Sequence, residues 1–449
     1  MSTNSPAPDQ PVPQSQPNRS KTDRRKFLTG LALGAGLAPF AALWPRQVTA
    51  GGGASLANDL CYSPTKPVLG VQDLSYLGYY DVQLNGSNSS YGQALTHRIV
   101  NGDLRLMTLE IDGRLYEFSL AGKSYGSTIS TPTRSWNGIG GLNNFNALWW
   151  EESRSRLWTT ACEDYTNIAH QVQIYTRTLN DNGTVSNING PVGLQGINAK
   201  RVYGGAQAVP GWFQAQYGVG PYVVGWGGYT SLVAQGGGAS MGPTMYAIPD
   251  PSGYGPNTEI PSGSYKVVMD NAYGDRGSRV TIPVNYFDGG DPRQNPDTRP
   301  TSPPLSTASW LSPFPDGLGR FVWGDSYYNT GLWIDGPNKH GFLMVASLCG
   351  GYCWYQTSTL AFDQRVFEAH IFDPAHLGEA IRGQRQPYAV KPASLGALNL
   401  PGMGFPWGGN SPTGNIAGAT YDPTTKRLYL IGRGVNTYFG RLFVYSVNA

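Results

Sequence analysis

The clearest alternation of apolar and polar residues lies near the C-terminus. A pair of small residues at 418–419 comes first and a turn follows at 422–425. Alternating runs at 427–432 and 441–447, separated by a Gly- and Asn-rich loop, each predict a strand. This stretch therefore predicts a small antiparallel sheet.

Weaker copies of this unit recur upstream. Their starts lie near residues 94, 147, 204 and 310. In the first copy, predicted strands at 105–110 and 114–120 flank Asp112-Gly113, a dipeptide that favours tight hairpin turns. With the start near 418, the successive separations are 53, 57, 106 and 108 residues. The chain is therefore predicted to repeat one small sheet along its length.

This spacing predicts an all-β protein, a β-propeller of five to seven blades. Repeats of about 40–50 residues with four short strands are typical of propeller blades. Because the last two separations are about twice the first two, further units are expected near residues 260 and 360, which favours seven blades. Without them the count is five or six. A β-sandwich needs far fewer residues and a β-helix has a shorter repeat, so both fit the pattern less well.

Composition agrees with this fold class. The 60 glycines and 34 prolines supply turns, and the 27 tyrosines and 12 tryptophans suit half-buried strands. Charged residues make up only 14% of the chain, fewer than the exposed faces of a helical bundle usually carry. The best helical pattern is one short segment at 373–382. We therefore expect a single propeller domain over residues 51–449.

The first fifty residues are expected to lie outside this domain. Residues 1–20 are rich in Pro, Gln, Ser and Asn and have too little apolar surface to offset the entropy of ordering. Thr-Asp-Arg-Arg-Lys-Phe-Leu follows at 22–28, then a mildly apolar run and the small residues Val-Thr-Ala at 48–50. A membrane anchor is the alternative, but the run is Gly-rich, contains Pro39 and is shorter than the roughly 20 residues of a spanning helix.

Residues 22–50 resemble the bacterial twin-arginine export signal. The Arg pair at 24–25 and Phe-Leu at 27–28 match its pattern, whereas Asp23 replaces the leading hydroxyl residue and Thr29 the trailing Lys. The resemblance implies a disordered tail and cleaved signal peptide over residues 1–50. It also implies transport of the folded chain by the twin-arginine export machinery and a periplasmic or secreted location.

Charge in the expected mature chain argues against a nucleic-acid partner. Six of the 32 basic residues and two of the 29 acidic residues precede residue 51, which leaves 26 basic and 27 acidic residues and a net charge near −1. Nucleic-acid binding would need a basic stripe. No later segment is long and apolar enough to be a membrane span, so none is expected in the mature protein.

Four cysteines follow the predicted signal, and an exported protein can form disulfides. Cys349 and Cys353 are close enough for a local bridge around a Gly-Gly turn, and Cys61 with Cys162 is a second possible pair. A metal clip is the competing interpretation. No His lies within a few residues to complete a usual zinc set.

Two short segments are similar to parts of bacterial secreted proteins that have no assigned activity. They are Gly-Leu-Trp-Ile-Asp-Gly-Pro-Asn-Lys-His-Gly at 331–341 and Phe-Asp-Pro-Ala-His-Leu-Gly-Glu-Ala-Ile-Arg-Gly at 372–383. This resemblance covers under a tenth of the chain and implies no particular chemistry.

The sequence carries no strong catalytic or cofactor signature. It has no Gly-x-Ser-x-Gly elbow, His-Glu-x-x-His motif, phosphate loop or dinucleotide fingerprint. A four-His metal centre on the propeller axis would need nearly all of the five histidines. That convergence is improbable, because His376 lies in the predicted helix and His370 shares a strand face with Glu368. We therefore expect neither a metal nor a cofactor.

The best concentration of reactive side chains is Asp325, Asp335 and His340, in a Gly-rich aromatic stretch at predicted strand ends. Propellers gather such loops at one rim of the central channel. Two carboxylates can act as general acid and base in glycoside hydrolysis, and His340 with a Tyr such as Tyr327 can transfer a proton in a polysaccharide lyase. The alternative is that the two aspartates only cap turns, since Asp335-Gly-Pro favours a turn by itself.

Aromatic residues in this stretch, and Trp150 in a second stretch beside Glu151 and Glu152, are candidates for stacking on a sugar ring. We predict substrate contacts from Trp150, Trp323, Trp333, Trp354 and Tyr327. Trp149 and Trp150 are adjacent in a predicted strand and so point to opposite faces. The alternative for these residues is packing between blades.

These observations favour a secreted carbohydrate-active enzyme, a polysaccharide hydrolase or lyase that acts on a polysaccharide or oligosaccharide at rim loops. The alternative is a non-catalytic glycan- or protein-binding propeller at the cell envelope. A lectin repeats its binding residues in every blade, whereas the Trp-rich stretch at 310–355 has no evident counterpart, which favours the enzyme. A redox propeller loaded with a cofactor before export is a third interpretation, but it lacks identifiable ligands.

Overall fold

The structure is a computed structural model that describes eleven ranges of the chain. They are residues 66–84, 94–110, 113–139, 145–161, 174–197, 204–226, 244–270, 327–356, 359–403, 415–435 and 439–449. All of them belong to one compact unit that spans Cys61–Ala449. The predicted signal region at 1–50 lies outside the described residues.

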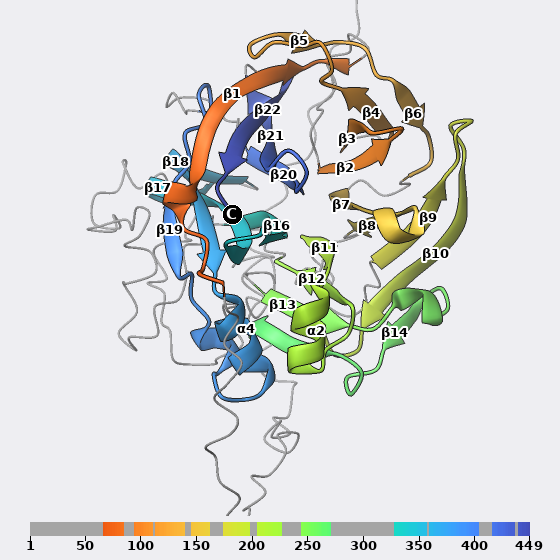
Figure 1. The fold of residues 1–449 in the computed structure, drawn as a ribbon, viewed down its shortest axis with the longest axis vertical. Coiled ribbons are helices and arrows are strands. Elements are labelled where there is room, and N and C mark those ends of the chain that lie inside the picture. The colour runs from red at the N-terminus through yellow and green to blue at the C-terminus, as the bar shows by residue number, and fades with distance from the viewer. Residues whose placement is uncertain are drawn as a thin grey trace, which may run out of the picture. The chain divides into compact units, whose positions relative to one another are not determined.

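The described residues form five sheets, each built mainly from strands that follow one another in sequence and pair antiparallel. We number them as blades one to five (Figure 1). Blade one contains β2 (Leu95–Val100), β3 (Asp103–Leu109), β4 (Leu115–Ser119) and β6 (Arg134–Trp136). Blade two contains β7 (Phe145–Glu151), β8 (Arg156–Ala161), β9 (Ile174–Leu179), β10 (Val185–Leu194) and β14 (Thr258–Ile260). Blade three contains β11 (Gly205–Ala208), β12 (Tyr222–Gly225), β13 (Thr244–Ile248) and β15 (Lys266–Asp270).

Blade four contains β16 (Tyr327–Asp335), β17 (His340–Gln356), β18 (Thr359–Phe372) and β19 (Ser394–Ala397). Blade five contains β20 (Asn415–Asp422), β21 (Arg427–Val435), β22 (Phe439–Val447), β1 (Leu74–Val82) and β5 (Thr128–Ile129). The protein is therefore mostly β, a five-bladed β-propeller.

The last blade is completed by the first strand of the fold. β1 pairs antiparallel with β22 from Leu74↔Val447 to Val82↔Gly440, so the N-terminal and C-terminal strands lie side by side (Figure 1). β5 then adds to the outer edge of β1 in parallel. Blade five thus needs both ends of the described chain.

Five hydrophobic clusters lie between successive blades and close the ring. Each cluster joins residues of two neighbouring blades, as Trp136 of blade one and Leu157 of blade two do, or Tyr429 of blade five and Phe118 of blade one. The innermost strands β2, β7, β11, β16 and β20 pack against one another in the same circular order. Burying a large apolar side chain contributes about 1.5–3 kcal/mol, so these interfaces are the main source of stability.

The blade count corrects the prediction from spacing. The predicted starts near 94, 147, 204 and 418 match the beginnings of four innermost strands, and the fifth, β16, begins at Tyr327. The expected units near 260 and 360 are not separate blades. β14 and β15 complete blades two and three, and residue 360 lies within β18. Two long strands, β17 and β18, occupy the length that suggested an additional blade, so the count is five and not seven.

Helices are short. α2 spans Gly211–Tyr217 and α4 spans Pro374–Ile381, with 3-10 turns at η3 (Val71–Asp73), η5 (Glu152–Arg154), η7 (Pro251–Gly253) and η11 (Pro387–Ala389). The predicted helix at 373–382 is confirmed, and the Asp373 carboxylate caps it by accepting a hydrogen bond from Ala375 N at 2.8 Å. In the part of the chain that the structure describes, no helix has the length and apolarity to cross a membrane.

The two predicted cysteine pairs lie in different parts of the chain. Cys349 and Cys353 both lie on β17, opposite Arg365 and Phe362 of β18. The two glycines between them fall at a shift of register within the strand and do not form the expected turn. The side chains of Cys349 and Cys353 lie outside what the structure describes, so a disulfide between them stays a prediction. Cys61 and Cys162 lie outside the described residues.

Candidate functional site

The structure brings Asp335 and His340 together. Asp335 ends β16, His340 begins β17, and the two residues pair directly across the hairpin. The turn between them contains Gly336-Pro337 and closes with a hydrogen bond from Gly336 N to Lys339 O at 3.0 Å. Local turn chemistry therefore places the predicted acid beside the predicted histidine.

The Asp335 carboxylate binds side chains from two distant parts of the chain. Its Oδ1 accepts a hydrogen bond from Lys66 Nζ at 2.8 Å, and its Oδ2 accepts one from the indole N–H of Trp212 at 2.9 Å. The Lys66 ammonium also donates to Gly336 O at 2.8 Å. The Lys66 and Asp335 side chains are 34% and 28% exposed, so this polar group is open to solvent.

His340 lies beneath the indole of Trp212. The two rings are stacked, with centroids 5.2 Å apart and an interplanar angle of 22°. His340 is 2% exposed, and its buried Nε2 has no hydrogen-bond partner. Burial lowers the pKa of His340, although the charges of Asp335 and Asp373 act in the opposite direction. The imidazole is therefore neutral at pH 7 and is not in contact with solvent.

The segment before β1 covers the same hairpin. His340 N donates to Pro67 O at 3.1 Å, and Leu69 N donates to His340 O at 2.8 Å. Asp73 accepts a hydrogen bond from Lys339 Nζ at 2.6 Å, and the ammonium helps to hold the pKa of that carboxyl below its usual value against the effect of burial. The segment before β1 therefore also holds the hairpin in place.

Trp212 is the residue that sequence reasoning missed. It lies on α2, which begins after Pro210 and ends at Gly218 in the left-handed region, with φ of 63°. The neighbouring Phe213 is fully buried between blades three and four and anchors the helix, while Trp212 stays partly exposed. The adjacent Trp and Phe in a short segment between two strands were a signal for such an anchored helix. The pairing with Asp335, 123 residues away, had no sequence signal.

Two of the predicted sugar-contacting tryptophans are buried between blades. Trp150 is 7% exposed, donates its indole N–H to Glu152 at 2.7 Å and lies under the Arg98 guanidinium. Trp333 is 9% exposed and packs against Phe213 and Phe342, each with centroids 5.1 Å away. These contacts account for both rings as packing residues, and their role in substrate binding stays a prediction.

Of the remaining four predicted residues, two lie on described strands. Tyr327 and Trp354 lie on β16 and β17, opposite Ser347 and Ala361. Asp325 and Trp323 lie outside the described residues, so their predicted catalytic and binding roles stay predictions.

A second polar group joins blades two and three. The buried Glu151 carboxylate accepts hydrogen bonds from Trp158 Nε1 at 2.9 Å and the Tyr222 hydroxyl at 2.6 Å, and it pairs with Arg156. Burial and this carboxylate raise the pKa of Tyr222 to about 12. Asp250 also pairs with Arg156, and its hydrogen bonds to Ser252 and Arg154 hold the pKa of the carboxyl at about 2 against burial. The members of this group bind one another, and their contacts link blade two to blade three.

Another buried histidine, His370, lies on β18. His370 and Glu368 are fully buried on one face of β18, with His370 Nε2 2.9 Å from a Glu368 oxygen, as the strand pattern predicted. Burial lowers the pKa of His370 despite this contact. Among the described residues, no group of three or more His, Cys, Asp or Glu side chains is arranged to hold a metal ion.

Comparison with known proteins finds no family and only distant structural similarity. No protein-family model and no curated protein matches the chain. Among solved structures it is similar to the holo form of the PQQ domain of pyranose dehydrogenase from Coprinopsis cinerea, at 11% identity and a TM-score of 0.38 over 85% of this chain and 98% of that one. A member of the DUF4221 family from Bacteroides vulgatus has 8% identity and a TM-score of 0.35 over 84% and 98%.

The β-propeller domain of Cps50 (Swd1) from Myceliophteria thermophila has 11% identity and a TM-score of 0.26 over 80% and 97% of the two chains. Similarity at this level carries no argument about substrate, cofactor or partner.

Proposed function

We propose that this protein is an exported propeller that binds a polysaccharide or oligosaccharide on the surface formed by Trp212, Asp335 and Lys66. The observation that carries the proposal is the hydrogen bond from the partly exposed indole of Trp212 to the partly exposed carboxylate of Asp335. It fixes an aromatic ring, an acceptor and a cation side by side. We call these three residues the Trp212 surface.

The chemistry of the Trp212 surface suits a sugar. The C–H groups of a sugar ring pack on an aromatic ring, and the indole combines such an apolar face with a polar edge. The Asp335 carboxylate accepts hydrogen bonds from hydroxyl groups, and the Lys66 ammonium donates them. One face of Trp212 is covered by His340, so a ligand would use the other face and the edge.

The Trp212 surface is also held in place before a ligand arrives. Phe213 anchors α2 in the core, and the stack on His340 fixes the orientation of the indole. Because fewer side-chain rotations are lost on binding, such preorganisation favours affinity. This supports a binding role for the described residues.

A polysaccharide hydrolase or lyase is the second candidate, and the cross-strand pairing of Asp335 with His340 favours it. A general acid or base must come within hydrogen-bonding distance of the reacting group. His340 Nε2 is buried beneath Trp212, so catalysis through this histidine would require the indole to move. We therefore place glycan binding first.

Export by the twin-arginine route to the periplasm or the cell exterior belongs to the same proposal. Its support is the Arg pair at 24–25 with Phe27 and Leu28. The pairing of β1 with β22 is compatible with it, because blade five is complete only when both ends of the chain are available. A route that transports folded proteins suits such a fold.

A glycan panel tests the binding proposal. The full chain is titrated with plant, algal and bacterial polysaccharides while reducing ends and unsaturated products are measured in the same samples. We expect at least one glycan to bind, and Trp212→Ala to weaken that binding about tenfold or more. Tyr125→Ala is the matched control, because Tyr125 is 42% exposed elsewhere on the propeller. Unchanged binding by Trp212→Ala, or no binding to any glycan, would overturn the proposal.

A further inference from the structure

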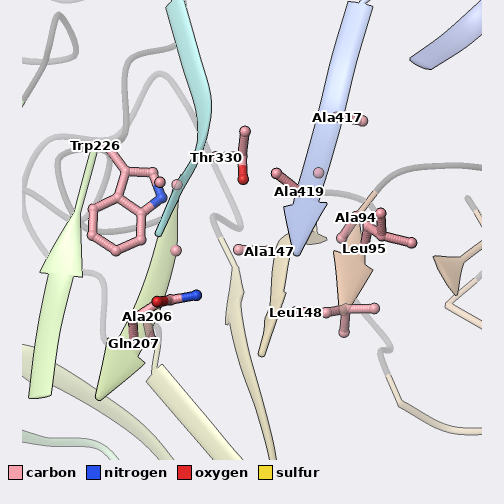
Figure 2. Close-up of a pocket in the computed structure, with 14 residues that line it drawn as sticks. Ala94, Leu95, Ala147, Leu148, Ala206, Gln207, Trp226, Thr330, Ala417 and Ala419 are labelled. Atoms are coloured by element: carbon pink, nitrogen blue, oxygen red, sulfur yellow. The ribbon is translucent and has the colours of Figure 1, made fainter. Parts of the chain in front are cut away.

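The innermost strands of all five blades surround a pocket in the central channel (Figure 2). Its cavity volume is about 20 Å³, so it has room for a group little larger than a water molecule. The lining residues are mostly small: Ala94, Leu95, Ala147, Leu148, Gly204, Gly205, Ala206, Gln207, Trp226, Thr330, Gly331, Ala417, Gly418 and Ala419. None of these described lining residues carries a charge. The pocket is thus a neutral site that every blade helps to form.

Trp226 places an unpaired donor in this pocket. The residue is 1% exposed, and its indole N–H has no hydrogen-bond partner. Figure 2 shows the indole nitrogen on the side of the ring that faces the pocket. Leaving a buried donor unpaired costs about 1–3 kcal/mol, so an acceptor in the pocket would stabilise the protein.

The indole is held firmly in this position. Trp226 has φ of 40°, in the left-handed region that non-glycine residues rarely adopt. Its ring lies directly over Gly205 and Gly331, where an added Cβ would approach ring atoms to 2.3 Å and 2.9 Å. Two glycines from neighbouring innermost strands therefore provide the space that the ring occupies.

A second donor comes from Gln207. Its side-chain Oε1 accepts a hydrogen bond from Trp333 N at 3.1 Å, so the amide oxygen is already used. The amide nitrogen is then the group that faces the pocket, as Figure 2 shows. Thr330 also lines the pocket and adds a hydroxyl that can donate or accept. Trp226 and Gln207 therefore offer donors to the pocket, and Thr330 can offer a third.

We propose that the channel pocket binds a small carboxylate anion through Trp226 Nε1, Gln207 Nε2 and the Thr330 hydroxyl. Hydrogen bonds to an ionised acceptor are about twice as strong as those between neutral groups, and no acidic side chain among the described lining residues repels an anion. Two carboxylate oxygens can accept several donors at once. The cavity is far smaller than the roughly 300–1,000 Å³ of pockets for drug-sized ligands, so the ligand has only a few atoms. This inference does not depend on the Trp212 surface.

Acetate is the probe for this proposal. The thermal unfolding midpoint of the full chain is measured against sodium acetate at constant ionic strength, with neutral acetamide as the control of similar shape. We expect a saturable rise with acetate and none with acetamide, because a ligand that binds only the folded state stabilises it. No rise would mean that the pocket binds no carboxylate, and an equal rise with acetamide would mean that the negative charge is not recognised; either result would overturn the proposal.

Variants place the effect in the pocket. Trp226→Phe keeps an aromatic ring and removes the donor, so the apparent dissociation constant for acetate should rise about tenfold or more. Trp136→Phe is the matched control, because this buried indole donates to Asn180 O outside the pocket and its loss should leave the acetate response unchanged. Gln207→Leu and Thr330→Val repeat the test if Trp226→Phe does not fold. An acetate response of wild-type strength in the folded pocket variants would show that acetate binds elsewhere.

Discussion

Trp212 stacks on His340 and at the same time donates its indole N–H to Asp335, the residue that pairs with His340 across the hairpin. One aromatic ring thus both shields the imidazole and holds the carboxylate. Because α2 carries Trp212 and belongs to the connection between β11 and β12, the relationship also links blade three to blade four. Its consequences can be measured as stability, binding and activity.

Replacement of His340 by Phe should reduce the loss of stability in mild acid. Burial lowers the pKa of His340 below the ordinary value of 6.5, so below about pH 6.5 the unfolded chain binds a proton that the folded chain excludes. The contribution of the neutral His340 to stability is fully present above about pH 6.5 and is lost as the pH falls toward the lowered pKa. His340→Phe keeps an aromatic stack and removes this titration. The measurement is the free energy of unfolding in urea at about pH 7.5 and about pH 5.5.

His97 and His370, whose pKa values burial also lowers, are unchanged in this variant and preserve part of the pH dependence. The prediction fails if wild type and His340→Phe lose the same free energy between the two pH values.

Asp335→Asn should separate the binding and catalytic candidates. Its ion pair with Lys66 is partly exposed, so the variant should lose no more than about 1 kcal/mol of stability. If the Trp212 surface only binds a glycan, affinity falls about tenfold and neither protein forms products. If the protein is a hydrolase or lyase, wild type forms products and Asp335→Asn does not. Asp325→Asn, tested in parallel, examines the other predicted carboxylate, and turnover retained by both variants would contradict the catalytic assignment.

Glu151→Ala should destabilise the propeller by about 3–5 kcal/mol, because it leaves two buried donors, Trp158 Nε1 and the Tyr222 hydroxyl, without their acceptor and removes one of the two carboxylates that pair with Arg156. Glu152→Ala is a matched control on the next residue. Glu152 is exposed and its contact is a single hydrogen bond from Trp150, so about 1 kcal/mol or less is expected. Urea unfolding measures both changes in the free energy of unfolding, and equal losses would show that Glu151 does not link the two blades.

Gly418→Ala should destabilise the ring by about 1–3 kcal/mol or more. An added Cβ would lie 2.2 Å from Leu95 N, a backbone atom of the neighbouring blade that has little freedom to move. Gly211→Ala is the matched control, because nothing lies within 4 Å of its added Cβ and the residue is exposed at the start of α2. Its thermal midpoint should match or slightly exceed that of wild type. A similar loss in both variants would argue against the close approach of the blades.

Removal of β1 should prevent formation of a monomeric propeller. A chain that begins at residue 84 lacks the strand that pairs with β22 and leaves that strand as an open edge, which favours aggregation. A chain that begins at residue 51, which lacks only the predicted signal region, should fold normally. Soluble yield and size-exclusion chromatography compare the two. A monomeric chain with cooperative unfolding after removal of β1 would contradict closure by this strand.

Much of the local structure was readable from the sequence. The small residues near 94, 147, 204 and 418 mark four of the five innermost strands, because mostly small side chains line the channel where five sheets converge. The Asp-Gly turn between β3 and β4 and the Asp373 helix cap were readable for the same reason: each depends on residues a few positions apart. The predicted pairing of Asp335 with His340 in one site also follows from a local hairpin.

The blade count, the Trp212 surface and the channel pocket depended on tertiary structure. Spacing alone counted the long strands β17 and β18 as an extra blade, and it had no sign that β1 would complete blade five. Lys66, Trp212 and Asp335 meet from three distant segments, and in the channel pocket Thr330 of blade four joins Gln207 and Trp226 from paired strands of blade three. The sequence by itself determined the strands, because alternation and turns act between near neighbours. Which side chains meet was decided by how five sheets pack into a closed ring, since that arrangement is the sum of many weak contacts between residues far apart in the chain.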